Sequence, residues 1–416
     1  MSEPTGVGFV PLWGAVTSLA LQNSPPVGPR LRELPLFLRG WAEIKIAAAM
    51  TNREMGVLDS QRADAIVEAA EEVVRGELLD HFPLRVLPTG GGTATNMNVN
   101  EVIASRATQI LSRTCDLKVH PNDHVNRSQS TNDTYPTAAK LLLMRQSGEI
   151  CAALRMLGRS FRRQADANAG IDRLGRTGWQ DAVSVPVSSF HGAQGVAAER
   201  FADQFEAVAG LLGSVQLGGT VLGTGIGAPP GFAPVAVGHL AAITGLTVKP
   251  SVDFADSFTH LDGYAALGDT AARCASILFK QASDFEILSS GPRGGLSELS
   301  LERLQPGSSI MPGKVNPAIP RLVIQASFAI RAAAFAVNLA VADGEPDING
   351  HSPVVVANLS PALTELSSVI GLFAEKCVDT LSWNPARLAE LNAYPFDTLI
   401  TEAEHAGYDA IAKNTI

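Results

Sequence analysis

Apolar residues recur every three or four positions over several long stretches of the chain, with polar residues between them. This spacing gathers apolar side chains on one face of a helix, so each stretch predicts an amphipathic α-helix. The predicted helices span residues 137–168, 190–217, 261–290, 322–342 and 361–381. Runs with apolar residues at every second position, which would indicate strands, are scarce. Helices this long and apolar need partners on more than one side, which favours an all-α bundle and an oligomer.

Polar, glycine-rich segments separate the predicted helices. Hydroxyl and amide residues are concentrated in them, and binding groups tend to lie on loops that a rigid scaffold holds in place. These segments are residues 88–100, 119–134, 174–182, 218–231 and 289–317. A change of composition near residues 383–385 indicates a small C-terminal unit. We therefore predict an N-terminal helical domain over residues 1–129, a central long-helix bundle over 130–383, and a short or truncated C-terminal unit over 384–416.

Composition excludes several classes of protein. The 416 residues are 46% hydrophobic and 18% charged, which is a globular profile, and the net charge of −9 comes with no basic cluster for nucleic acid. The four cysteines lie far apart in sequence and predict no metal knuckle. Residues 207–248 contain no Lys, Arg, Asp or Glu, but their many glycines and prolines disfavour a membrane helix. No secretory signal is visible, so we expect a cytoplasmic protein without a membrane or nucleic-acid partner.

The loops carry neutral hydrogen-bond donors and one cation, a combination that suits an anion. Such donors bind a carboxylate, and they bind still better the extra negative charge that forms when the neighbouring carbon loses a proton. Glycines such as Gly307 let backbone amides approach a ligand closely. The candidate groups are Thr93, Asn96, Ser130, Thr131, Asn132, Thr177, Ser308, Ser309, Lys314 and Asn316. The residues alone therefore predict an anion site on a helical bundle.

Three of these loops resemble the signature segments of the fumarase/aspartase superfamily, in the same order along the chain. Residues 307–317 (GSSIMPGKVNP) are similar to its signature loop, residues 93–101 (TATNMNVNE) to its first segment, and residues 120–133 to its second. The similarity runs from about Trp13 to about Leu381. The resemblance implies a long central helical bundle assembled as a homotetramer, with loops of three subunits at each active site. It implies no metal and no organic cofactor.

By this resemblance the chain is a carbon–nitrogen lyase acting on a small dicarboxylate, a substituted succinate, by β-elimination to give fumarate. Ser308 would be the general base that takes the proton next to a carboxylate. Lys314 and Asn316 would hold that carboxylate and stabilise the aci-carboxylate intermediate. The remaining substrate oxygens would be bound by Thr93, Ser130, Thr131, Asn132, Thr177 and Ser309.

Two positions depart from the fumarase pattern. Gly178 follows Thr177 where fumarases usually carry His, and Arg321 lies five residues beyond Asn316 where they carry Glu. Loss of this His–Glu pair weighs against hydration and favours a C–N lyase. If Arg321 lines the site, its charge favours nitrite leaving from nitrosuccinate over ammonia leaving from aspartate. The alternative is that Arg321 pairs with a nearby carboxylate.

Other functions stay open beside this hypothesis. The chain could be a fumarate hydratase, a lyase for larger substrates, or a non-catalytic binding relative. Residues 312–315 match the branch of the family that takes small substrates, which argues against the larger ones. Intact Ser308, Lys314 and Asn316 argue against a non-catalytic protein.

Two further motifs carry weaker signals. His120 and His124, with Asp123 between them, have a spacing found in metal sites, but Pro121 is expected to break helical geometry and no third ligand is evident. Residues 223–227 (GTGIG) faintly resemble a dinucleotide loop, but no strand precedes them and no βαβ unit surrounds them. We therefore predict no metal and no nucleotide.

Overall fold

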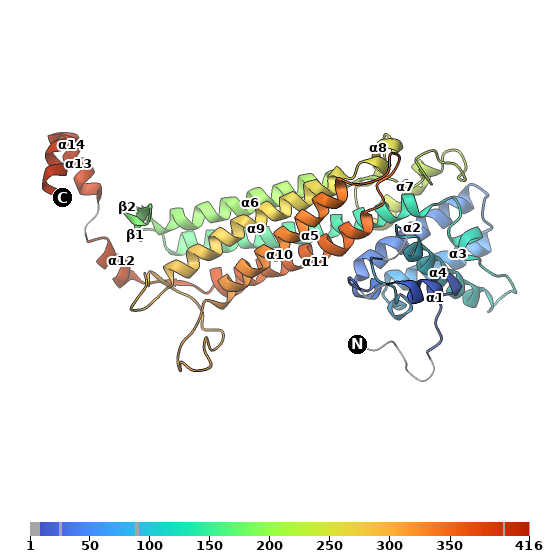
Figure 1. Cartoon of the computed structure of the whole chain (residues 1–416), viewed down its shortest axis with the longest axis horizontal. Coiled ribbons are helices and arrows are strands. Elements are labelled where there is room, and N and C mark those ends of the chain that lie inside the picture. Colours follow the sequence, from blue (N-terminus) through green and yellow to red (C-terminus); the bar gives the residue numbers. More distant parts are fainter. Residues whose placement is uncertain (1–8, 25–26, 88–90, 394–395, 416) are drawn as a thin grey trace. The chain divides into compact units, whose positions relative to one another are not determined.

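The computed structural model describes residues 9–24, 27–87, 91–393 and 396–415, and helices dominate them (Figure 1). The chain divides into two compact units, each made of three separate stretches. The first unit comprises residues 1–148, 205–271 and 331–364, and the second comprises residues 149–204, 272–330 and 365–416. The prediction of an all-α protein is confirmed, because the strands within the described residues are few and short.

Five long helices each contribute residues to both units. They are α5 (Thr131–Ala167), α6 (Val187–Leu211), α9 (Asp262–Leu288), α10 (Ala318–Val341) and α11 (Ser352–Phe373). All five coincide with predicted helices, because apolar spacing maintained over this length leaves little ambiguity. The start of α11 was predicted too late, at Pro361. This proline lies inside the helix instead of opening it.

Two of these helices, α10 and α11, are long and apolar enough to cross a membrane by length and composition. Each is tied to a neighbouring helix through a polar side chain. The Ser327 hydroxyl on α10 donates to the backbone oxygen of Ala275 on α9, at 2.9 Å. Gln146 on α5 donates to the backbone oxygen and the hydroxyl of Ser360 on α11, at 2.9 and 3.0 Å. These contacts are those of helices in a protein core.

The first unit also contains the shorter helices of the N-terminal part of the chain. They are α1 (Ala15–Asn23), η1 (Leu31–Glu33), α2 (Pro35–Glu54), α3 (Ser60–Val74), η2 (Leu79–His81), α4 (Thr93–Leu111) and η3 (Pro121–Val125), followed further along the chain by α7 (Phe232–Thr244) and α8 (Phe254–Thr259). Two short strands, β3 (Ser214–Val215) before α7 and β4 (Lys249–Pro250) after it, form a parallel pair. Helix α3 begins after Asp59, whose carboxylate accepts a hydrogen bond from the backbone N–H of Arg62.

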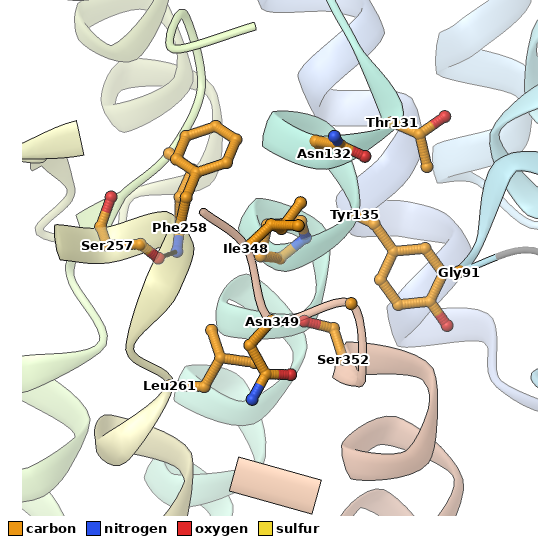
Figure 2. Close-up of a pocket in the computed structure, with 13 residues that line it drawn as sticks. Gly91, Thr131, Asn132, Tyr135, Ser257, Phe258, Leu261, Ile348, Asn349 and Ser352 are labelled. Atoms are coloured by element: carbon orange, nitrogen blue, oxygen red, sulfur yellow. Dashed lines mark hydrogen bonds between the residues drawn. The ribbon is translucent and has the colours of Figure 1, made fainter. Parts of the chain in front are cut away.

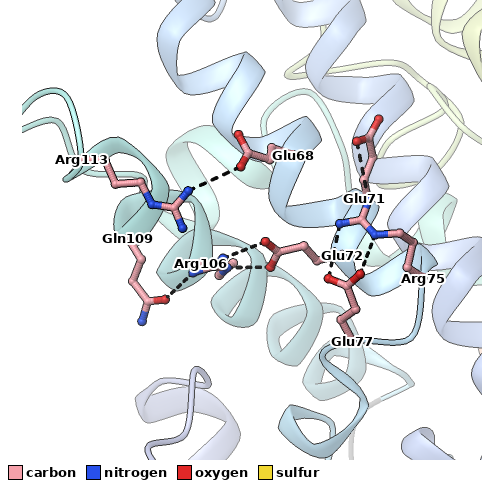
Figure 3. Close-up of polar contacts among 8 residues, drawn as sticks. All are labelled: Glu68, Glu71, Glu72, Arg75, Glu77, Arg106, Gln109 and Arg113. Carbon is pink, nitrogen blue, oxygen red and sulfur yellow. Dashed lines mark hydrogen bonds and ion pairs between the residues drawn. The ribbon is translucent and has the colours of Figure 1, made fainter.

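Ion pairs lie along α3, α4 and the residues that directly follow them (Figure 3). Arg106 binds both carboxylate oxygens of Glu72, at 2.6 and 2.8 Å. Arg113 lies 4.0 Å from Glu68, and Arg75 pairs with Glu77. The Arg106–Glu72 pair is largely buried, whereas the other two pairs are exposed and each contribute little.

The second unit packs around aromatic side chains from several helices. Phe161 and Phe285 stack with ring centroids 6.2 Å apart, and Phe373 meets Phe285 edge-on at 5.7 Å. Buried His191 lies in the same cluster, and its Nε2 accepts a hydrogen bond from the indole N–H of Trp383, at 3.0 Å.

The second unit also holds a hairpin and the C-terminal helices. Its other elements are β1 (Asp172–Thr177), β2 (Gln180–Pro186), β5 (Leu299–Ser300), η4 (Ala374–Val378), β6 (Ser382–Trp383), α12 (Pro385–Leu391), α13 (Phe396–Ala406) and α14 (Tyr408–Thr415). The interpretation of residues 174–182 as a loop was wrong, because they belong to the β1–β2 hairpin. Its two turn residues, Gly178 and Trp179, both have positive φ. A tryptophan is a rare choice at such a position, so the turn gave no sequence signal.

Candidate functional site

The predicted site residues fall into one group in each unit. Thr93, Ser130, Thr131 and Asn132 belong to the first unit, and Thr177, Ser308, Ser309, Lys314, Asn316 and Arg321 belong to the second.

In the first unit, the predicted residues lie at the N-termini of α4 and α5. Thr93 is the first residue of α4, which follows Gly92 at φ 101° without a side-chain cap. Thr131 is the first residue of α5. Backbone N–H groups in a first helical turn lack intrahelical partners, and the helix dipole makes this end positive. Two such ends therefore suit an anionic ligand.

Asn96 links these two N-termini. Its Nδ2 donates to the hydroxyl oxygen of Thr131, at 3.0 Å. The neighbouring side chains are also fixed: the Ser130 hydroxyl oxygen accepts from the backbone N–H of Asn132, at 3.3 Å, and Asn132 Nδ2 donates to the backbone oxygen of Val221, at 2.8 Å. Because the Thr131 and Ser130 oxygens act as acceptors in these bonds, both hydroxyl protons are left to donate to a ligand.

Thr131 and Asn132 also line a small cavity of about 20 Å³ in the first unit. Figure 2 shows it between Thr131, Asn132 and Tyr135 of α5, residues 257–258 of α8, and residues 348–352 at the start of α11. This volume is close to that of a single water position and is too small to enclose a dicarboxylate. A substrate would therefore meet these donors at the surface of the unit.

Two buried charged residues lie near these helix N-termini, and sequence reasoning did not identify them. Lys45 of α2 and Asp133 of α5 are both fully buried. Burial lowers the pKa of Lys45 to about 7, against the attraction of Asp133. Burial raises the pKa of Asp133 to about 7, although its backbone N–H partners and Lys45 act to lower it.

The hydrogen bonds of this pair are those of the charged forms. The Lys45 ammonium donates to three amide oxygens, on Asn96, Asn126 and Gln129, at 2.9, 3.1 and 3.0 Å. A neutral amine has two protons and could not make all three bonds. Asp133 accepts from three backbone N–H groups, of residues 130, 218 and 220, at 2.9, 3.1 and 3.0 Å. A carboxylate is the form that accepts three such bonds.

In the second unit, the loop that contains Ser308 closes on itself. The backbone N–H of Gly307 donates to the backbone oxygen of Lys314, and Asn316 Nδ2 donates to the backbone oxygen of Gly307, both at 2.8 Å. A Cβ at Gly307 would lie 2.7 Å from the backbone nitrogen of Asn316, so this position requires glycine. The loop residues from Ser309 to Asn316 are exposed.

The Ser308 hydroxyl oxygen accepts two backbone hydrogen bonds within this loop. They come from Ile310 at 3.2 Å and from Met311 at 3.0 Å. Two N–H groups aimed at one hydroxyl oxygen stabilise negative charge on it. This arrangement could therefore support a serine that gives up its proton.

Two more predicted residues belong to the same unit. Thr177 is exposed at the end of β1, next to the hairpin turn. Arg321, in the first turn of α10, pairs with Glu286 of α9, with 2.6 Å between Nε and Oε1. Partial burial raises the pKa of Glu286, and Arg321 acts to lower it. Arg321 thus makes the carboxylate contact that was the alternative to a role in the site.

The histidine segment forms local bonds. His120 Nδ1 accepts from the backbone N–H groups of Asn122 and Asp123, and His124 Nδ1 accepts from that of His120. Pro121 opens the short π-helix η3, where its missing N–H is not needed, and His120 before it is extended, so the two histidines do not share a helix. In the part of the chain that the structure describes, no three His, Cys, Asp or Glu residues are grouped to hold a metal ion.

Comparisons with known proteins identify the family to which this chain is similar. A family model described as a lyase matches residues 13–332. Fumarate hydratase class II 2 of Bradyrhizobium diazoefficiens is 37% identical over 405 residues, covering 96% of this chain and 85% of the relative. An aspartate ammonia-lyase of a Bacillus species is 32% identical over 403 residues, covering 96% and 86%. The crystal structure of recombinant class II fumarase from Schistosoma mansoni matches with a TM-score of 0.92 and 32% identity, covering 98% of this chain and 89% of that one.

Proposed function

Because the chain belongs to the fumarase/aspartase superfamily of lyases, we propose that it removes a leaving group from a substituted succinate to form fumarate. The observation that carries this proposal is the Ser308 hydroxyl oxygen, which accepts hydrogen bonds from two backbone N–H groups. A serine can act as a general base only where its alkoxide is stabilised, and these two donors meet that need. Lys314 and Asn316, on the same loop, would then hold the carboxylate next to the carbon that loses its proton.

The remaining substrate oxygens would be bound by neutral donors from the first unit and the hairpin. The free hydroxyl protons of Ser130 and Thr131 suit the second carboxylate, and the N-terminus of α4 at Thr93 adds backbone donors. Asn132, Thr177 and Ser309 would complete the set. Neutral donors held in place stabilise the extra negative charge that develops on the carboxylate during proton removal. This suits an aci-carboxylate intermediate.

For the leaving group, we propose C–N cleavage with release of ammonia. The pairing of Arg321 with Glu286 supports this choice over nitrite, because an arginine neutralised by a carboxylate offers little attraction to an anion. Gly178 and Arg321 also replace the His and Glu that the resemblance associates with hydration. The second candidate is fumarate hydratase, and the relative of that name that is 37% identical to this chain supports it.

Exposed apolar residues support the expected homotetramer with shared active sites. Ile310 of the signature loop is 85% exposed, and Phe335 on α10 is 66% exposed. A base loop that water surrounds would be poorly placed for catalysis, so a second subunit covering it is consistent with the proposal. We further propose a cytoplasmic enzyme that needs neither metal nor organic cofactor, as expected of a chain similar to fumarate hydratases and aspartate ammonia-lyases.

The test is fumarate formation, followed by ultraviolet absorbance, with L-aspartate, nitrosuccinate and L-malate in parallel. We expect fumarate from aspartate, and Ser308→Ala should lower kcat by about 10²- to 10⁴-fold. Ser276→Ala is the matched control, since that hydroxyl donates to the backbone of its own helix. Fumarate from malate alone would establish the hydratase instead. Fumarate from nitrosuccinate alone would identify nitrite as the leaving group. An unchanged kcat in Ser308→Ala would remove Ser308 as the base.

A further inference from the structure

The Lys45 ammonium is a costly feature of the first unit that packing does not explain. It is fully buried beneath the site, and its three protons all go to side-chain amides, those of Asn96, Asn126 and Gln129. The Trp41 ring lies 5.7 Å from its nitrogen. A buried charge is often replaceable by an apolar residue of similar size without loss of stability. Its presence here therefore indicates a task other than holding the fold.

The contact with Asn96 fixes which way that side-chain amide points. Because Asn96 Oδ1 accepts from Lys45, its Nδ2 faces the other way and donates to the Thr131 hydroxyl oxygen. Nδ2 also lies 3.1 Å from the Oδ1 of Asn126, which itself accepts from Lys45. The ammonium therefore orients the Asn96 amide in two ways: it donates to Oδ1 directly, and it holds the Asn126 oxygen that accepts from Nδ2.

The orientation of Asn96 decides what Thr131 can do. A hydroxyl group has one proton, and Thr131 keeps it for a ligand only while its oxygen receives a hydrogen bond from Asn96. With the Asn96 amide reversed, its oxygen would face Thr131 and take that proton. The hydroxyl would then present only lone pairs to an incoming carboxylate, which repels them.

Asp133 secures the same segment from the other side. Its carboxylate accepts from the backbone N–H of Ser130 and from those of Gly218 and Thr220, so it ties the start of α5 to residues 218–220. Asp133 also attracts Lys45, which acts to raise the pKa of the buried ammonium and favours its charged form. Segment 130–132 is therefore held by Asp133 directly and by Lys45 through Asn96.

We propose that Lys45 is a positioning residue that acts through the side-chain amide of Asn96 to keep the Thr131 hydroxyl proton available to a substrate carboxylate. This inference rests on the proposed function, in which Thr131 binds the dicarboxylate. It predicts that the contribution of Lys45 to binding passes through one hydroxyl group and disappears with it.

A double-mutant cycle tests this coupling on the full chain, with KM and kcat measured for the substrate that gives fumarate. Lys45→Met keeps the length of the side chain and removes the donors. It should raise KM about tenfold and leave kcat within about threefold, because the lost contact binds ground state and transition state alike. In the Thr131→Val background, Lys45→Met should change KM by less than about twofold. Two effects that simply multiply would show that Lys45 is structural and would overturn the proposal.

Two further variants guard the interpretation. Lys140→Met is the matched control, because this partly buried lysine of the same unit donates to the backbone oxygen of Ser214 and should leave KM unchanged. If Lys45→Met does not fold, Asn96→Asp takes its place. That variant keeps an acceptor for Lys45 and sets a second acceptor against Thr131. Its rise in KM should disappear in the Thr131→Val background, whereas an equal rise in both backgrounds would mean charge repulsion alone and contradict the proposal.

The wild-type protein separates this inference from the proposed function. Succinate, an unreactive dicarboxylate, serves as the probe for binding by calorimetry. A wild-type chain that forms no fumarate and binds no succinate overturns the proposed function itself. A wild-type chain that does both, with independent effects of Lys45→Met and Thr131→Val, overturns only the positioning role.

Discussion

His191 should make the protein sensitive to acid within a defined range of pH. Its side chain is fully buried among Phe161, Phe190 and Phe285, and its Nε2 accepts from Trp383. Burial, with a smaller contribution from a nearby arginine, lowers the pKa of His191 from 6.5 to about 4. Each pKa unit corresponds to about 1.4 kcal/mol, so this difference corresponds to on the order of 3 kcal/mol.

The sign follows from which state binds the proton. Between pH 6.5 and 4 the unfolded chain protonates this histidine and the folded chain does not, so acid favours unfolding. The stabilisation is complete above pH 6.5 and is lost as the pH falls toward 4. Over the interval from pH 7 to 4.5, His191 should account for about 2.5 kcal/mol of the decrease in the free energy of unfolding.

The assay is urea unfolding of the wild-type chain and of His191→Gln at several pH values from 7 to 4.5. Glutamine keeps an oxygen that can accept from Trp383 but does not titrate, so its free energy of unfolding should fall by about 2.5 kcal/mol less than that of the wild type. His405→Gln, at an exposed position, should follow the wild type. Parallel pH profiles of His191→Gln and the wild type would refute the reasoning.

Two other substitutions test contacts that the structure assigns. Glu101→Gln should lower the free energy of unfolding by about 2–3 kcal/mol in chemical denaturation. One carboxylate oxygen accepts from the backbone of Gly14 and from the backbone and hydroxyl of Thr17, and the other accepts from the backbone of Val16, so glutamine sets its NH₂ group against at least one of these donors. A loss below about 0.5 kcal/mol would contradict this. Because Arg321 is engaged with a carboxylate, Arg321→Gln should leave the relative rates with aspartate and nitrosuccinate unchanged. The control Arg331→Gln should leave them unchanged as well. A selective loss of nitrosuccinate turnover in Arg321→Gln would show that Arg321 acts in the site.

The helices were predictable because their signal is local. A helix such as α9 repeats its apolar spacing over many turns, and no tertiary contact is needed to recognise it. The start of α11 was missed because Pro361 normally marks a first turn, whereas here the chain continues the helix through it. The β1–β2 hairpin was missed because Trp179 takes a positive φ that its residue type seldom adopts.

The loops of the candidate site were recognisable from their motifs, but the groups that support them were not. Lys45 is one of two charged residues, with Glu43, in the otherwise apolar stretch 41–49 (WAEIKIAAA). In such a pattern the ammonium usually reaches water along the helix surface. Its three partners are 51, 81 and 84 residues away in sequence. Whether a lysine is buried depends on packing across such separations, and no local spacing reports it. The same holds for Arg321 and Glu286, which lie on different helices.

The two steps of the proposed reaction, proton removal and departure of the leaving group, depend on different kinds of groups. On this proposal, proton removal depends on the backbone N–H groups that face Ser308, and backbone donors do not change when side chains are replaced. On the same proposal the leaving group meets side chains, which substitution alters freely; position 178, a glycine where the fumarase pattern has His, is one such place. A fixed base with an adaptable leaving-group region is consistent with relatives at similar identity being named for both water and ammonia chemistry. Leaving-group preference should therefore follow the side chains around the site, while loss of Ser308 should abolish turnover of every substrate alike.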